Sequence, residues 1–343
     1  MPYTVKSSEQ HRKAASDSET KALLYLMNFH PDKNEIHFFV VDFFNDLTGM
    51  DRISKKLWDV QSKGAKNNTA KALGRELVTL LKNFLSSFEF ESYILFVGGV
   101  ADSFRIDNSI DIFGIENVNE KAKNSLLDGL REEAKKKNYT KDLQLSDETL
   151  NSFLETVCFV VDTKQPKDYV RAIIQEHPAI IPDDDTLISV FEEIKQKQSS
   201  KKDASNVEGV EINTPDEALS FCRHITTSEL KMLTLQRILH KNPLEQGIPI
   251  HFIPVIEKSS VKDREEICRY CQTAMCRALF NTNTTQEFWT LFETVYNLIC
   301  SYPDEGVQEL YNRLDVQTLS LINDFDTLSM KYFIATIKDG IRK

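Results

Sequence analysis

The sequence lacks any apolar run that is long enough to cross a membrane. Its strongest apolar stretches, residues 36–41 and 93–97, have the length of β-strands, whereas a membrane-spanning helix needs about 20 residues. The first 22 residues (MPYTVKSSEQHRKAASDSETKA) are polar and charged, so they lack the apolar core of a secretory signal. We therefore expect a cytoplasmic protein that does not enter the membrane.

Cysteine is also scarce. Six cysteines in 343 residues, without a secretory signal, are not typical of a disulfide framework, and we expect reduced thiols. Cys268, Cys271 and Cys276 have a spacing compatible with zinc, but no second CxxC or His pair lies nearby, and their stretch has helical periodicity. The pattern favours buried thiols in a helix core.

The sequence has fewer basic than acidic residues, 42 Lys and Arg against 52 Asp and Glu. A formal net charge of −10 and a pI of about 5.3 argue against a protein that coats nucleic acid through its overall charge. Between residues 52 and 82, however, eight Lys or Arg accompany two acids. Such a run is usually a solvated face, but it could also bind a polyanion. The candidate DNA-contacting residues are Lys55, Lys56, Lys66, Lys71 and Arg75.

The first third of the chain has the pattern of a mixed α/β fold. Residues 18–29 have the periodicity of an amphipathic helix. Residues 36–44 (IHFFVVDFF) are apolar in both alternating sets, which indicates a strand buried on both faces of a sheet covered by helices. Residues 45–50 are predicted to form a turn, and residues 57–63 the partner strand.

A crossover unit is predicted next. Residues 70–87 have the spacing of one long helix, and residues 92–97 form an apolar strand closed by Gly98-Gly99. Residues 121–137 are predicted as a surface helix and residues 153–162 as another buried strand. Short helices are expected over residues 169–176 and 186–198.

The second half is predicted to be almost entirely helical. Residues 198–214 have the composition of a linker, although Val210 and Ile212 could form a short strand, and we place the domain boundary near residues 206–216. This gives an α/β domain over residues 1–205 and an all-α domain over residues 216–343. Helices are expected over residues 215–222, 227–240, 261–280, 285–301, 305–314 and 316–341.

Polar side chains interrupt the two strands predicted near the N-terminus. Asp42 lies in the middle of an apolar strand, where an isolated buried carboxylate costs several kcal/mol unless it is paired or bound to a metal. Asp46 follows in phase with it. On the partner strand, alternation places Asp59, Gln61 and Lys63 on one face. These groups could therefore meet on one side of the sheet.

This set of side chains suits Mg²⁺-dependent phosphodiester hydrolysis. A hard cation prefers carboxylate, carbonyl and water oxygens, and a nearby lysine can orient or help to deprotonate the attacking water. Asp42 and Asp46, followed by Gln61 and Lys63, supply such groups, and Gly64 permits close approach of the backbone. We therefore expect a site for Mg²⁺ or Mn²⁺.

The order of these segments carries a family resemblance. VVDFFNDLTG, a short loop, LWDVQSKG, a long helix and the strand SYILFVGG together resemble the PD-(D/E)xK, or restriction-endonuclease-like, superfamily in its Gln-x-Lys variant. More narrowly, this part is similar to the endonuclease domain of bacterial anti-phage effectors associated with cyclic-nucleotide (CBASS) signalling and to the nuclease subunit of Lamassu systems. The resemblance covers roughly the first 200 residues, including TVCFVVDT and SVFEEIKQKQ.

The resemblance implies a restriction-endonuclease-like α/β core, followed here by an all-α domain. It also implies that Asp46 is the metal-binding acid, Gln61 the second ligand and Lys63 the catalytic lysine. Asp42 resembles an additional upstream acid of this branch, and Glu19 resembles a helix-borne glutamate that completes metal coordination in many members. Gln61 replaces the usual second carboxylate, so metal binding is expected to be weaker when no DNA phosphate is present.

Each of these residues also has a simpler explanation. Asp46 could belong to a turn, Gln61 and Lys63 to the solvated face of an edge strand, and Glu19 to a helix capping box. Taken together, they favour a nuclease core. The alternative is a non-catalytic DNA-binding or scaffold subunit that retains a nuclease-like fold.

The resemblance implies a metal-dependent endonuclease effector that hydrolyses double-stranded DNA after complex assembly or oligomerisation. The expected partners are double-stranded DNA, other defence-system subunits (SMC-like in the Lamassu case) and further copies of the chain in the active form. An unrestrained nuclease would cut the host chromosome. The helical half is therefore predicted to hold the nuclease inactive until the oligomeric state changes.

Overall fold

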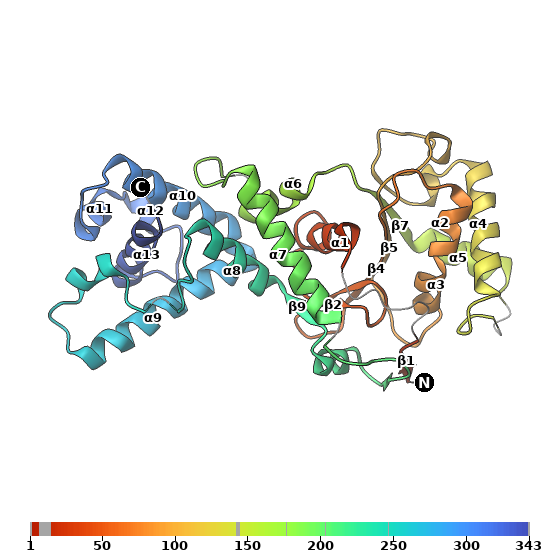
Figure 1. Cartoon of the computed structure of the whole chain (residues 1–343), viewed down its shortest axis with the longest axis horizontal. Helices are drawn as coiled ribbons and strands as arrows, with labels where there is room; N and C mark the ends of the chain where they lie inside the picture. The colour runs from red at the N-terminus through yellow and green to blue at the C-terminus, as the bar shows by residue number, and fades with distance from the viewer. Residues whose placement is uncertain are drawn as a thin grey trace. The chain divides into compact units, whose positions relative to one another are not determined.

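The computed structural model of the chain describes residues 2–6, 15–141, 145–175, 177–202, 204–245 and 247–341. The chain forms two compact units (Figure 1). Unit 1 comprises Met1–Tyr169 and Phe191–Thr227, and unit 2 comprises Val170–Val190 and Ser228–Lys343.

Unit 1 is built on a mixed seven-stranded sheet with the strand order β6-β7-β5-β4-β3-β2-β9. β4, β5 and β7 run parallel, whereas β3, β2, β9 and the edge strand β6 pair in antiparallel fashion with their neighbours. A second, two-stranded sheet pairs β1 with β8. The strands are β1 (Tyr3–Thr4), β2 (Ile36–Val41), β3 (Leu47–Asp51), β4 (Leu57–Lys63), β5 (Ser92–Val97), β6 (Ile112–Phe113), β7 (Val157–Val161), β8 (Glu211–Ile212) and β9 (His224–Thr226).

Helices cover both faces of the large sheet, as Figure 1 shows for α1 on one side and α2, α4 and α5 on the other. Tyr93, Leu95 and Val97 of β5 join the core formed with α2–α5, whereas Phe96 contacts Tyr25 of α1 with ring centroids 5.9 Å apart. The predicted α/β fold with a covered sheet is confirmed. The helices are α1 (Asp17–Asn28), α2 (Ala70–Glu76), α3 (Val78–Phe84), α4 (Glu120–Ala134), α5 (Asp147–Thr156), α6 (Pro166–Arg171) and α7 (Asp184–Lys202).

The turn predicted over residues 45–50 is wrong, because most of this segment forms β3. Leu47 and Met50 are fully buried, and Gly49 allows α1 to pack closely on the strand. A Cβ atom at Gly49 would lie 3.2 Å from side-chain atoms of Leu26 and Ile36. Thr48 and Gly49, residue types that also occur in turns, are here accommodated in a buried strand, whereas Asp46 precedes it.

Two further elements differ from the prediction in their bounds. The long helix expected over residues 70–87 is divided at Leu77 into α2 and α3 and ends at Phe84. Four of its leucines are buried as expected, whereas Leu85, just beyond the helix, is 37% exposed. In the strand expected over residues 153–162, residues 153–156 belong to α5 instead. Ser146 caps that helix by accepting a hydrogen bond from the Thr149 amide, and Phe153 packs in the core from its helical position.

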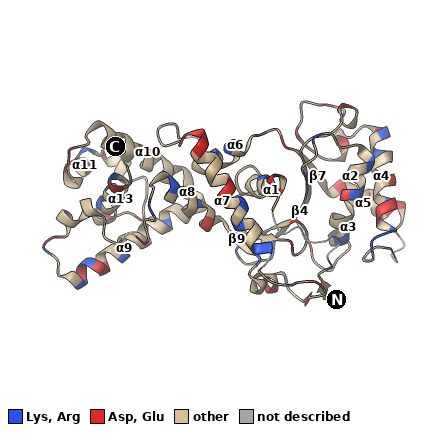
Figure 2. Cartoon of the chain, in the orientation of Figure 1, with Lys and Arg blue, Asp and Glu red and all other residues tan. Residues whose placement is uncertain are grey.

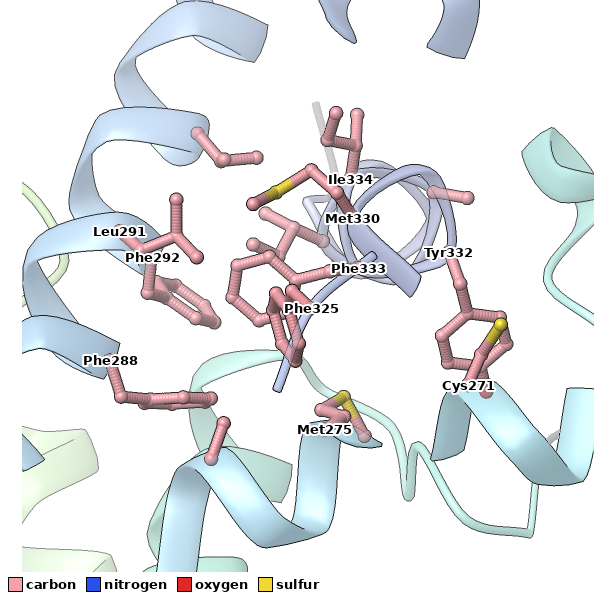
Figure 3. Packing of buried hydrophobic residues seen from close by; sticks show 14 of the residues in the cluster. Cys271, Met275, Phe288, Leu291, Phe292, Phe325, Met330, Tyr332, Phe333 and Ile334 are labelled. Atoms are coloured by element: carbon pink, nitrogen blue, oxygen red, sulfur yellow. The ribbon is translucent and has the colours of Figure 1, made fainter. Parts of the chain in front are cut away.

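Unit 2 is helical, as predicted for the C-terminal region, and α13 lies in its core. Figure 3 shows Phe333 of α13 packed among Phe288 and Phe292 of α10 and Met275 of α9. The single helix expected over residues 316–341 is instead two helices, α12 and α13. The helices are α8 (Thr227–Ile238, whose first residue belongs to unit 1), α9 (Val261–Phe280), α10 (Thr285–Ser301), α11 (Val307–Arg313), α12 (Val316–Leu319) and α13 (Thr327–Gly340).

Cys268 and Cys271 of α9 are buried in this core, as predicted, and Cys276 is half-buried. Burial raises the pKa of the Cys271 thiol to about 12, so it is protonated at neutral pH.

Short 3₁₀ helices complete the fold: η1 (Asp102–Phe104), η2 (Ile115–Asn117), η3 (Ala172–Ile174), η4 (Pro215–Phe221), η5 (Ile250–Val255) and η6 (Thr282–Thr284). No helix in the described part of the chain combines the length and apolar character that a membrane span requires.

Residues 206–216, whose composition suggested a linker, are packed within unit 1. Val207 and Ile212 lie in a small core with Tyr3 and Phe44, and β8 pairs with β1. The chain passes from unit 1 to unit 2 after Thr227. An earlier segment, Val170–Val190, also belongs to unit 2 and ends within α7.

Candidate functional site

The loop between β2 and β3 carries two of the predicted site residues. β2 ends at Val41, and Asp42 adopts a positive φ of 49°. This left-handed conformation is uncommon except for Gly, Asn and Asp. The Asp42 amide donates to the Asp46 carbonyl at 3.2 Å, and Arg223 Nη1 donates to the Asp42 carbonyl at 2.8 Å. Asp42 therefore lies just after the strand, and its predicted position in the middle of the strand is wrong.

Asp46, in the loop just before β3, lies opposite Gln61 of β4. The β3–β4 register pairs Leu47 with Val60, which places the preceding Asp46 across from Gln61. Gln61 Nε2 donates to Asp46 Oδ2 at 2.8 Å. The same oxygen accepts hydrogen bonds from the amide and the hydroxyl of Ser62 at 2.9 and 3.1 Å. Asp46 is thus held in place by three donors from β4.

The environment of Asp46 is electronegative. Burial of its carboxyl group and the negative charges of Glu19 and Asp42 raise its pKa to about 7, although the Ser62 amide and Lys202 act in the opposite direction. At neutral pH this carboxyl group therefore exchanges readily between its charged and neutral forms. Strongly shifted carboxyl groups are frequent in functional sites.

Glu19 extends this electronegative region from α1. It completes a capping box with Ser16, in which each backbone amide donates to the other residue's side chain. The capping explanation is therefore correct, but the same carboxylate has a second role. Glu19 Oε2 also lies 2.6 Å from Lys202 Nζ, which in turn lies 3.3 Å from Asp42 Oδ2. We name Glu19, Asp42 and Asp46 the acid cluster.

Lys202, the last residue of α7, was not predicted as a site residue. Its side chain is only 4% exposed, and those of Glu19 and Asp42 are each 14% exposed. Burial lowers the pKa of Lys202, but Asp42 and Glu19 outweigh burial, so the net pKa lies above the usual value. Lys202 is therefore a charged ammonium within the acid cluster.

Lys63 lies on β4 two residues after Gln61 and contacts a different acid. Its Nζ is 2.7 Å from Glu76 Oε1 of α2, and its side chain is 44% exposed. The Gln61 carbonyl oxygen accepts a hydrogen bond from the Thr79 hydroxyl at 2.7 Å. In this arrangement the amide nitrogen of Gln61, rather than its oxygen, points towards Asp46.

The chain packs tightly where β4 and β5 end. A Cβ atom at Gly98 would lie 2.5 Å from the Gly64 carbonyl, and a Cβ at Gly64 would lie 3.3 Å from that of Ser18 in α1. Glycine at these positions therefore brings the end of β4 close to the first turn of α1, where Glu19 lies. This explains why the acid of the helix is near the polar residues of the strands.

Asp59 does not join the acid cluster, although its strand position places it in phase with Gln61. It is fully buried, and Asn83 Nδ2 donates to its Oδ2 at 2.6 Å. Lys82 lies close by and donates to the Phe44 carbonyl at 2.9 Å. Burial raises the pKa of Asp59 and lowers that of Lys82, while each charge opposes the shift of the other. Asp59 and Lys82 thus belong to a buried network beneath the β2–β3 loop.

The candidate DNA-contacting residues do not form one continuous patch. Lys55 and Lys56 precede β4 and Lys66 follows it, so the seven residues of the strand separate them by about 23 Å. Lys71 and Arg75 of α2 are both paired with Glu132 of α4, at 2.5 and 3.2 Å. Figure 2 shows basic and acidic residues interspersed along α2 and α4.

Within this set, Lys66 lies on the side of the acid cluster. Lys56 is paired with Glu35 at 2.5 Å, whereas Lys55 and Lys66 form no ion pair with any described residue. An unpaired lysine needs to break no contact before it binds a phosphate. Lys66 is therefore the candidate whose position best fits a nucleic acid bound at this end of β4.

The described ranges contain no group of three or more His, Cys, Asp or Glu side chains that is arranged to hold a metal ion. Comparison with models of protein families finds no match, and comparisons with curated proteins and with solved structures find no significant match.

Proposed function

We propose that the chain is a metal-dependent DNA endonuclease of the PD-(D/E)xK type, acting as an effector of bacterial anti-phage defence. The observation that supports this most strongly is the contact between Asp46 and Gln61, with Glu19 and Asp42 close by and Lys63 two residues further along β4. These are the residues whose pattern resembles that family. Four distant parts of the sequence, α1, the β2–β3 loop, β4 and the end of α7, contribute to one region.

The donor chemistry fits a divalent cation such as Mg²⁺ or Mn²⁺. The acid cluster offers carboxylate oxygens and Gln61 an amide oxygen, which are the ligands that hard cations prefer. Burial is the main cause of the raised pKa of Asp46, and the negative charges of Glu19 and Asp42, which a cation would neutralise, raise it further. When bound, the cation would act as a Lewis acid on a phosphate group.

Two contacts must change before these donors can converge. Gln61 must turn its oxygen towards Asp46, and Thr79 permits this because its hydroxyl can donate instead to the Glu76 carbonyl at 3.3 Å and accept from the Gln61 amide. The ammonium of Lys202 must also release Glu19 and Asp42. Both changes involve side-chain rotation.

In this proposal Lys63 interacts with the phosphate or with the attacking water. Its ammonium is partly exposed and is held by a single carboxylate, Glu76. Exposed ion pairs of this kind contribute only about 0–1 kcal/mol. Lys63 can therefore exchange its contact with Glu76 for one with a phosphate oxygen at a small cost in free energy. After the reaction it can pair with Glu76 again.

The second candidate function is a non-catalytic DNA-binding or scaffold subunit. It is favoured by the fact that no three-acid metal group is already formed among the described residues, and by the engagement of Lys63 with Glu76. Under both proposals the partners are double-stranded DNA and other defence subunits. For the nuclease, we propose that activity depends on assembly into an oligomer through the helical region, in the cytoplasm.

Incubation of the full chain with supercoiled plasmid and Mg²⁺ or Mn²⁺ separates the two proposals. A nuclease should nick or linearise the plasmid, and Lys63→Ala or Asp46→Asn should abolish cutting. Lys33→Ala is the matched control, since Lys33 is an exposed lysine of unit 1 that contacts the Asn28 carbonyl and no site residue. If the chain binds DNA but does not cut it, whether it is assayed at low concentration or at a concentration at which it forms oligomers, the scaffold proposal is supported instead.

A further inference from the structure

A buried cation already lies within the acid cluster. Lys202 Nζ is 2.6 Å from Glu19 and 3.3 Å from Asp42, and its side chain is 4% exposed. A lysine is rarely buried unless it is paired, and here the pairing is with two of the proposed metal ligands. The proposed metal and Lys202 therefore require the same carboxylate oxygens.

We infer that Lys202 is the resident cation of the acid cluster and that its ammonium competes with a divalent metal ion for Glu19 and Asp42. This inference rests on the proposed function, because it assigns a role to Lys202 at the same site. Without metal, Lys202 neutralises part of the repulsion among the three acids. With metal, a second cation beside the ammonium would be repelled, so the ammonium leaves the cluster.

The position of Lys202 is set by one face of α7. Lys195, Gln198, Ser199 and Lys202 follow the three-and-four spacing of a helix, and each contacts α1 or the residues just before it. Lys195 pairs with Asp17 at 2.5 Å, the Gln198 side-chain oxygen accepts from Thr20 at 3.0 Å, and Ser199 Oγ accepts from the Ala15 amide at 2.9 Å. Lys202 is the last contact of this row.

The packing of this face of α7 on α1 fixes where the Lys202 side chain lies. Three contacts fix the register of α7 against α1, so the ammonium is returned to Glu19 whenever the metal departs. The long lysine side chain can also swing out without disrupting those contacts. The site thus has two alternative cations, one internal and one from solution.

The first test measures Mn²⁺ binding to the full chain by calorimetry. Lys202→Met keeps the apolar length of the side chain but removes the charge, and it should bind Mn²⁺ on the order of tenfold more tightly than the wild type. Lys201→Met is the matched control, because it removes the same charge from the adjacent position of α7. The control should bind Mn²⁺ as the wild type does.

Because Lys202→Met leaves two partly buried acids without their partner and can destabilise the fold, a second measurement uses the wild type. Lysine acetylation, followed by peptide mass spectrometry with and without Mn²⁺, reports whether each lysine is accessible. Mn²⁺ should increase acetylation of Lys202 several-fold and leave that of Lys201 unchanged.

The outcomes distinguish this inference from the proposed function. Equal Mn²⁺ affinity of Lys202→Met and wild type, or bound Mn²⁺ with Lys202 still protected from acetylation, would overturn the competition while leaving the metal site intact. Absence of Mn²⁺ binding to either protein at millimolar concentration would overturn both.

Discussion

The amide nitrogen of Gln61 donates to the carboxylate of Asp46 at 2.8 Å, one residue beyond the paired part of β3 and β4. A carboxylate at position 61 could not donate this hydrogen bond and would repel Asp46. Glutamine therefore stabilises the metal-free site, whereas a second acid would stabilise the metal-bound one.

Gln61→Glu should lower the stability of the metal-free protein and enlarge its response to metal. The lost hydrogen bond and the added repulsion should cost about 1–3 kcal/mol, and Mn²⁺ should recover more stability than it adds to the wild type. Thermal unfolding with and without Mn²⁺ measures both effects. Gln61→Met, which removes the hydrogen bond without adding charge, is the control and should show no enlarged response.

Asp46→Ala should remove most of the stabilisation by Mn²⁺. A ligand that binds only the folded state adds about 2.7 kcal/mol at a concentration 100 times its dissociation constant, and this gain requires the ligand residues. Asp59→Asn is the matched control, since Asp59 is a buried carboxyl group bound to Asn83 rather than to the acid cluster. If Mn²⁺ shifted the unfolding temperature of Asp46→Ala and wild type equally, Asp46 would not be a ligand.

DNA affinity should depend on Lys66 more than on Lys56. Lys66 lies at the end of β4 near the acid cluster and forms no ion pair with the described residues, whereas Lys56 lies at the far end of the strand and pairs with Glu35. Lys66→Glu should weaken binding for all sequences and reduce the salt slope by about one. Fluorescence anisotropy at several salt concentrations provides the comparison. A larger effect of Lys56→Glu would place the DNA at the opposite end of β4.

Much of the fold and part of the site were predictable from local pattern. The apolar alternation of β2, β4 and β5 and the periodicity of α1, α9 and α10 gave the α/β core and the helical region. Asp46 and Gln61 meet as predicted, although Asp46 lies in the loop before β3 and not in the strand that was expected to carry it. Alternation along β4 also predicted that Asp59 would share the face of Gln61. Asp59 instead accepts a hydrogen bond from Asn83 of α3, and no local sequence pattern predicts that contact.

Lys202 shows where local reasoning fails. It belongs to the polar stretch QSSKKDA, whose composition is that of a linker, yet it ends a 19-residue helix and contacts Asp42, which is far away in the sequence. The helical spacing of Lys195, Gln198, Ser199 and Lys202 is the signal in the sequence, but the predicted helix ends at Gln198, whereas α7 continues to Lys202. The contact itself depends on tertiary packing of α7 on α1.

Unit 2 contains a second buried lysine, Lys231 of α8. Its side chain lies in the helical core, where Nζ donates to Thr285 Oγ1 at 3.0 Å and the residue is 6% exposed. Burial lowers its pKa to about 8 from the ordinary 10.5. The folded state therefore bears the cost of the buried charge fully below pH 8, and this cost disappears as the pH rises towards 10.5.

Lys231→Met should accordingly stabilise the chain near neutral pH, by up to about 3 kcal/mol for a shift of this size, less the hydrogen bond to Thr285. The gain should shrink between pH 8 and pH 10, because over that range the unfolded wild type binds more protons than the folded one and its own stability rises. Urea unfolding of both proteins at pH 7 and pH 9.5 measures the difference. Lys262→Met, at an exposed position of α9, is the control and should show no such trend. A stability difference between Lys231→Met and wild type that does not change with pH would mean that Lys231 keeps its ordinary pKa, and that the hydrogen bond to Thr285 fully offsets its burial.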